Sequence, residues 1–170
     1  MADKVAGTRH LEAEFGDRLY ETAVRICGNE ADAEDFVFRT FERAVSCIHQ
    51  YSGRSSFFTW LYGILVSLMR TDARRKAANA LVFQSELPDH EDERPNVGEV
   101  LSAENEAIIV RKAVRELPDA YRAILVFRYY DDLTVPEIAQ VLSLPEGTVK
   151  RRLHEAKNLV RANIRCEIEN

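Results

Sequence analysis

Two short segments near the end of the chain begin with the same pattern, and they constrain the fold more than any other feature. Thr134-Val-Pro-Glu137 and Ser143-Leu-Pro-Glu146 each place a hydroxyl residue three positions before a glutamate, with a proline between them. The pattern is typical of a capping box, which satisfies free amides at a helix start and tolerates proline in the first turn. It predicts helices beginning at Thr134 and Ser143, separated by a turn of about two or three residues, as in a helix-turn-helix.

The rest of the chain also has the pattern of helices. Only 7 Gly and 5 Pro occur among 170 residues, which argues against a loop-rich β architecture. Apolar residues recur at helical spacing from about residue 8 to 27, from 29 to 48 and from 57 onward, with Gly28 as a stop and Asn29 as an N-cap. Two further helices are expected at about 102–117 and 119–130, on either side of Pro118.

Charge is distributed unevenly and divides the chain. Residues 84–106 hold eight acidic residues and one base, together with Pro88, Pro95 and Gly98. Such a stretch cannot bury an apolar face and is typical of a solvated linker. We therefore expect an all-α protein of two small helical domains joined by a flexible acidic linker: a helical bundle at 1–80, the linker at 81–102 and a helix-turn-helix domain at 103–170.

The acidic total does not exclude a nucleic-acid partner. The net charge is −5, which at face value argues against one. Residues 84–106 carry −7, however, which leaves +2 for the rest of the chain, and residues 134–165 hold six basic residues against three acidic ones. Salt-sensitive contact with phosphates is therefore compatible with the composition.

The second helix of the predicted helix-turn-helix has a narrow apolar stripe, made by Val149, Leu153, Ala156 and Val160 at helical spacing. The opposite face points away from the core, and an outward arginine near the start of such a helix can reach guanine while flanking cations bind phosphates. A merely solvated basic face is the alternative, but the tight turn between two proline-marked helix starts favours DNA binding. The predicted DNA-binding residues are Thr148, Lys150, Arg151, Arg152, His154 and Lys157.

Motifs from both predicted domains resemble the extracytoplasmic-function sigma factors of bacterial RNA polymerase. Asp32-Ala-Glu-Asp35, Gly53-Arg-Ser-Ser-Phe57 and Thr59-Trp-Leu-Tyr62 resemble region 2 of that family. Leu117-Pro118, Tyr129-Tyr130, Glu137-Ile-Ala139 and Pro145-Glu-Gly-Thr-Val-Lys150 resemble region 4. The two resemblances stand in the family's order and cover nearly the whole chain.

The resemblance implies a role for each element. The helix from Asp32 to Ile48 would dock on the clamp coiled coil of the largest polymerase subunit, through Asp32, Glu34, Asp35, Phe38, Arg39 and Arg43. The turn at 50–56 and the following helix would capture the melted −10 element, through Tyr51, Arg54, Ser55, Phe58, Tyr62, Arg70, Arg74 and Arg75. The helix-turn-helix would read the −35 element. Implied partners are core polymerase, including its flap, promoter DNA and an anti-sigma factor, with no cofactor.

Several positions depart from the family pattern. Phe38-Arg39 stands where a polar, acidic pair is common, Phe58 and Gly63 stand where arginine is common, and Ser143 replaces a frequent glycine in the turn. Phe38 is about 100° from the centre of its helix's apolar stripe, so it is expected to be partly exposed. Either it widens the core stripe or it forms a protein-docking patch.

The sequence offers little support for an enzyme. The four histidines lie in unrelated settings, and neither HExxH nor a glycine-rich phosphate loop occurs. Cys47 and His49 form a pair too small for a metal site, so we expect none.

No apolar run long enough for a membrane span occurs, which predicts a cytosolic protein. A stand-alone helix-turn-helix regulator is the alternative function, although it leaves the N-terminal motifs unexplained.

Overall fold

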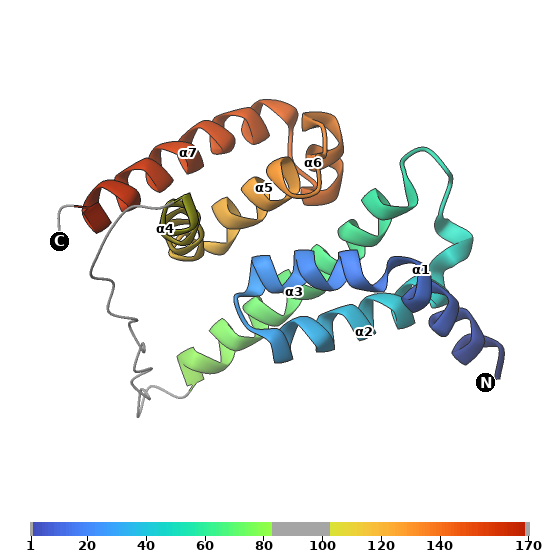
Figure 1. Cartoon of the computed structure of the whole chain (residues 1–170). Helices are drawn as coiled ribbons and strands as arrows, with labels where there is room; N and C mark the ends of the chain where they lie inside the picture. Colours follow the sequence, from blue (N-terminus) through green and yellow to red (C-terminus); the bar gives the residue numbers. More distant parts are fainter. Residues whose placement is uncertain (1, 83–102, 169–170) are drawn as a thin grey trace.

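A computed structural model of the chain describes residues 2–82 and 103–168. Every regular element in these two ranges is a helix, so the predicted all-α class is confirmed (Figure 1). The predicted acidic linker lies outside the described residues from position 83 onward.

The N-terminal half consists of α1 (Ala2–Cys27), α2 (Glu30–Cys47), the short 3₁₀ helix η1 (Ile48–Gln50) and α3 (Phe57–Val82). Gly28 ends α1 with a φ of +72°, a conformation that glycine adopts without strain. The Asn29 side chain then caps α2 by accepting a hydrogen bond from the Asp32 amide at 3.1 Å. Both predicted helix boundaries are therefore confirmed. Fully buried Leu19, Phe41 and Leu65 hold the three long helices together.

The C-terminal half consists of α4 (Ala103–Arg115), α5 (Asp119–Tyr129), α6 (Val135–Leu142) and α7 (Glu146–Ile168). The capping box predicted at Thr134 is present, because the Thr134 amide donates to Glu137 Oε2 at 2.8 Å and the Thr134 hydroxyl accepts from the Glu137 amide. The helix-turn-helix of α6 and α7 is thus confirmed.

The prediction that Ser143 begins the second of these helices is wrong. Ser143 instead caps the end of α6, with its amide bonded to the Gln140 carbonyl at 3.2 Å, and α7 begins at Glu146. The tight turn requires one residue in the left-handed conformation, and Ser143 supplies it with a φ of +50°. This is the turn position at which the resembling family often has glycine.

The two halves pack against each other, which the sequence did not predict. Figure 1 shows α4–α7 on one side of α1 and α3, with α2 on the other side. Helix α1 contacts α5 and α3 contacts α6, and one cluster of buried apolar residues runs through both halves. Tyr62 and Phe127 meet at this boundary with ring centroids 5.3 Å apart.

Candidate DNA and polymerase interfaces

Helix α7 has the two faces that its sequence predicts. Val149 and Ala156 are fully buried and Leu153 is half-buried, so the apolar stripe is confirmed. Lys150, Arg151 and His154 are exposed on the other side, and Thr148 is half-buried at the helix start. Arg151 is held along the helix by an ion pair with Glu155 at 2.8 Å. The exposed face therefore presents a restrained guanidinium beside an exposed lysine.

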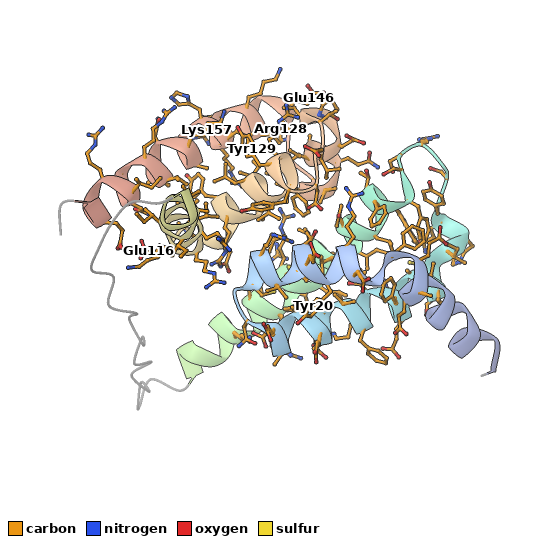
Figure 2. The ribbon with its side chains drawn as sticks, in the orientation of Figure 1. Tyr20, Glu116, Arg128, Tyr129, Glu146 and Lys157 are labelled. Carbon is orange, nitrogen blue, oxygen red and sulfur yellow. The ribbon has the colours of Figure 1, made fainter. Side chains whose placement is uncertain are left out.

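Two of the predicted DNA-binding cations lie at the edges of this face. Lys157 Nζ lies 5.4 Å from the centroid of the Tyr129 ring, and both side chains are seen in the C-terminal half (Figure 2). Arg152 is half-buried and lines a cavity between the two halves of the molecule. Lys157 is nevertheless exposed, so of these two cations only Arg152 is partly withdrawn from solvent.

The aromatic residues around the turn before α3 form a cluster. The rings of Tyr51, Phe57 and Trp60 lie 5.3–5.4 Å apart, and the Tyr51 hydroxyl donates to the Ser55 carbonyl at 2.7 Å. Tyr51 and Ser55 are half-buried, whereas Arg54 is exposed. The cluster therefore fixes the turn and leaves an exposed arginine at its tip.

Phe58 follows Phe57 in α3, and both rings pack against Phe15. The Phe58 ring packs edge-on against Phe15, with centroids 5.0 Å apart, and the Arg18 guanidinium lies 4.5 Å from its centroid. Phe58 is half-buried by these contacts. Its arginine neighbour supplies a positive charge at a position where the resembling family often has an arginine of its own.

Tyr62 is not at the surface, in contrast to the exposed position that base stacking requires. Its side chain is 0% exposed, and its hydroxyl donates to Asp131 Oδ1 at 2.7 Å. Burial raises the pKa of the Tyr62 hydroxyl, and the hydrogen bond and charge of Asp131 act in the same direction, although the Thr22 hydrogen bond and the Arg18 charge oppose them. The hydroxyl is therefore a neutral donor. The burial of Tyr62 could not be predicted from its local sequence, because its partner Asp131 belongs to the other half of the chain.

The basic residues predicted on α3 lie along its C-terminal part. Arg70, Arg74 and Arg75 are exposed, and Arg75 pairs with the buried carboxylate of Asp72 at 2.8 Å. Partial burial lowers the pKa of the Arg70 guanidinium, and the nearby charges of Arg152 and Arg74 act in the same direction. Arg70, Arg74 and Arg152 therefore lie close enough to repel one another where α3 approaches α7, and Asp32, Asp72 and Asp119 line the same cavity as Arg70 and Arg152.

Most of the predicted polymerase-binding residues of α2 are exposed, but Asp32 is half-buried and lines the cavity between the two halves. Phe38 is 52% exposed, as expected, and Arg39 pairs with Asp35 at 2.9 Å. Glu34 and Arg43 are also exposed, and Asp32 lies 3.6 Å from Lys76. Since α2 lies away from α4–α7, most of this face is uncovered (Figure 1). A large exposed aromatic side chain surrounded by charged residues is the arrangement expected of an aromatic anchor with a polar rim at a protein-docking surface.

A second apolar surface, to which sequence reasoning gave no role, lies between α4, α5 and α7. A groove of about 320 Å³ separates Val110 and Val114 from Tyr129 and Val160. Tyr129 and Tyr130 are 54% and 48% exposed. Lys157 and Arg161 lie in the groove wall. The sequence feature that could have indicated this surface is the adjacent pair Tyr129-Tyr130 at the end of α5. We call this surface the tyrosine groove.

The described residues contain neither a helix that could span a membrane nor a metal-ligand cluster of three or more histidine, cysteine, aspartate or glutamate side chains. The site chemistry on these residues is that of charged and aromatic surfaces.

Comparisons with known proteins address both halves. Residues 13–79 match the family model described as Sigma-70 region 2, and residues 107–160 match Sigma-70, region 4. The chain is 32% identical to the ECF RNA polymerase sigma factor SigW of Bacillus subtilis, covering 89% of this chain and 85% of that protein. It is 29% identical to the ECF RNA polymerase sigma-E factor of Haemophilus influenzae, covering 78% of this chain and 75% of that protein.

A solved structure shares the fold. The sigma factor RpoE from Bartonella quintana, solved in complex with the anti-sigma factor NepR, superposes with a TM-score of 0.72 at 17% identity, covering 92% of this chain and 96% of that one.

Proposed function

The chain belongs to the ECF sigma factors of RNA polymerase, and we propose that it binds core polymerase and directs initiation at promoters read through two DNA surfaces. The observation that carries the proposal is the joint match to regions 2 and 4 in one chain. A stand-alone regulator needs only the helix-turn-helix and has no use for region 2. The protein thus contributes binding energy and specificity, while the polymerase performs the chemistry.

In this proposal α7 reads the −35 element in the major groove. The exposed Arg151 is suited to guanine, because its fork of donors matches the two acceptors at the guanine edge. Lys150 and Lys157 contact phosphates on either side and position the helix without reading sequence. Thr148 and His154 complete the base-facing side, and Arg152 reaches the backbone once it leaves the cavity between the halves.

The turn before α3 and the exposed part of α3 hold the melted −10 element. Exposed Arg54, Arg70, Arg74 and Arg75 provide a positive track for a single strand, and the accessible edges of Tyr51 and Phe58 lie beside it. Ser55 contributes a hydroxyl at the tip of the turn. Tyr62 takes part only in a conformation that removes it from Asp131.

Two surfaces are assigned to core polymerase. The exposed face of α2, with Phe38 at its centre, is suited to the clamp coiled coil of the largest subunit. The tyrosine groove is suited to the flap, because an apolar floor with lysine and arginine in its wall accepts an amphipathic helix that has acidic flanks. Since the solved RpoE structure contains an anti-sigma factor, we extend the proposal to a protein inhibitor of this chain.

A reconstitution experiment tests the proposal. Purified protein is mixed with bacterial core polymerase, and promoter-dependent transcripts are sequenced from a library of randomised upstream regions. We expect a complex with core polymerase and transcripts that share two upstream elements. A chain that binds duplex DNA but neither binds core polymerase nor directs initiation would instead be a stand-alone regulator.

A further inference from the structure

The two proposed DNA surfaces face each other across the boundary between the halves. Arg70 of α3 and Arg152 of α7 line the same cavity of about 320 Å³. Beside it, Gln140 of α6 donates to the Ser55 hydroxyl in the turn before α3 at 3.1 Å. The first helix of the helix-turn-helix therefore covers part of the surface proposed for the −10 strand.

A buried carboxylate joins the halves at this boundary. Asp131, in the connection between α5 and α6, is 4% exposed. Its Oδ1 accepts hydrogen bonds from the Tyr62 hydroxyl at 2.7 Å and from the Thr22 hydroxyl at 2.9 Å. Arg18 donates to the Asp131 backbone carbonyl at 3.0 Å. Each of these donors belongs to the N-terminal half, so every one of these bonds crosses the boundary.

The cost of burying this carboxylate makes the arrangement specific. A charge removed from water is stabilised only where donors are in place to receive it, and α1 and α3 supply those donors at one point. Two further contacts lie alongside: the Tyr62 ring packs against Phe127, and the Arg25 guanidinium lies 4.7 Å from the centroid of Tyr130. Polar and apolar contacts thus select one orientation of the halves.

This orientation is incompatible with simultaneous use of both DNA surfaces. Elements centred at −10 and −35 are about 25 base pairs apart, or about 85 Å at 3.4 Å per pair. Arg70 and Arg152, from the two surfaces, line one cavity. The halves must separate before both elements are bound, a requirement that rests on the proposed function.

We propose that the surface of α1 and α3 carrying Arg18, Thr22 and Tyr62 is a docking surface for the Asp131 connection of the same chain, and that this docking holds the free protein in a closed, inhibited state. The occupant is therefore internal to the chain. Polymerase or DNA must displace it.

A native thiol reports on the closed state. Cys27 lines the cavity between the halves, opposite Asp119 and Ala120 of α5. Burial, with smaller effects of the charges around it, raises the pKa of its thiol to about 11, so the closed protein holds little reactive thiolate. Cys166 is exposed and serves as the internal reference. Alkylation of the full chain, followed by peptide mass mapping, gives both rates without polymerase or promoter.

Three variants of Asp131 and its partner form the test, with Asp17→Ala as a control that removes an exposed acid from α1. Asp131→Ala removes the carboxylate that accepts from the two buried hydroxyls, so Cys27 should react about tenfold faster while Cys166 is unchanged. Asp131→Asn keeps the Oδ1 acceptor and has no charge to bury, so its Cys27 should react no faster than that of wild type. Thr22→Val removes one donor at similar volume and should give a smaller increase.

The inhibitory role has its own readout. Opening uncovers the Ser55 side of the proposed −10 surface, so Asp131→Ala should bind a mixed-sequence single-stranded oligonucleotide more tightly than wild type, by fluorescence anisotropy. Unchanged Cys27 rates in both Asp131→Ala and Thr22→Val would overturn the docking. Faster Cys27 alkylation with unchanged oligonucleotide affinity would overturn inhibition. Because the thiol rates need no polymerase, a failure of the proposed sigma activity leaves the docking result decisive.

Discussion

The pKa of the buried Asp131 carboxyl depends on the residues packed around it. Burial raises the pKa of this carboxyl, although the Tyr62 and Thr22 hydroxyls and the Arg18 guanidinium act in the opposite direction. A raised pKa means that the folded protein binds the proton more tightly than the unfolded chain does. The carboxyl's contribution to stability is therefore present at low pH and is lost as pH rises through the raised pKa.

The Asp131→Asn variant isolates this effect, since it cannot ionise at that position. We expect the free energy of unfolding of the wild type, relative to Asp131→Asn, to decrease as pH rises from about 4, near the usual aspartate pKa, towards neutrality. Urea titrations of both proteins across that range measure it. A difference that is independent of pH would contradict the raised pKa.

Arg151 and Lys150 are neighbours with different proposed roles. Arg151→Ala should cost about 1–3 kcal/mol at one base pair of the −35 element and relax discrimination there. Lys150→Ala should weaken binding to all duplexes and reduce the slope of affinity against salt by about one. Binding assays on matched and mismatched duplexes at several salt concentrations separate the two. The reverse pattern would mean that α7 lies in the groove with another rotation.

Phe38 is the residue with which we probe the α2 surface. Because it is 52% exposed, Phe38→Ala should leave the melting temperature nearly unchanged. It should weaken binding to core polymerase by about 1 kcal/mol or more, as truncation of a central aromatic usually does. Glu42→Ala, on the same helix but outside the proposed set, is the matched control. Equal affinities of wild type and Phe38→Ala would remove the docking role.

At the scale of elements, the sequence predicts a helix end correctly where a single glycine or capping residue determines it. Gly28 and Asn29 mark the boundary between α1 and α2, and Thr134 marks the start of α6, each as the sequence predicts. Ser143 was misread because a hydroxyl residue before proline and glutamate serves a helix start in most settings, whereas here the preceding helix ends on it. The local pattern is the same at Thr134 and Ser143. In the short turn, however, Ser143 caps the end of α6 and not the start of α7.

The difference between Thr134 and Ser143 is measurable. Thr134→Ala should destabilise the protein by about 1 kcal/mol, because it removes a working cap. Ser143→Gly should be neutral or stabilising, since glycine adopts the positive φ found there more readily than serine does. Chemical denaturation of the two variants tests this. A loss of stability in Ser143→Gly comparable to that in Thr134→Ala would restore Ser143 as the cap of α7.

At the scale of the whole molecule, the packing of the halves lay beyond sequence reasoning. Tyr62 and Asp131 are 69 positions apart, and each has an ordinary alternative role, as a surface aromatic or a surface acid. Helical periodicity identifies which face of a helix is buried, but it does not identify what buries it. The α2 surface was predictable because its residues share one helix, whereas the tyrosine groove needs three helices together.

The shared core predicts how the molecule unfolds. Because one cluster of buried residues extends through both halves, we expect a single cooperative calorimetric transition for the wild type. Asp131→Ala should broaden or divide that transition, as the halves lose their polar connection and melt separately. Two resolved transitions in the wild type would show that the halves are thermodynamically independent.

Helix α7 is one continuous helix that connects the proposed DNA face to the end of the helix bonded to α4. Its 23 residues span about 35 Å at 1.5 Å per residue. Its first turns carry the proposed DNA face, whereas Asn163 and Glu167 near its far end are bonded to α4 at 3.1 and 2.8 Å. A tilt imposed on the tyrosine groove is therefore transmitted rigidly to Arg151. Helical geometry fixes the rotation of the DNA face about the α7 axis relative to the tyrosine groove. Inserting one residue between them would change that rotation by about 100°.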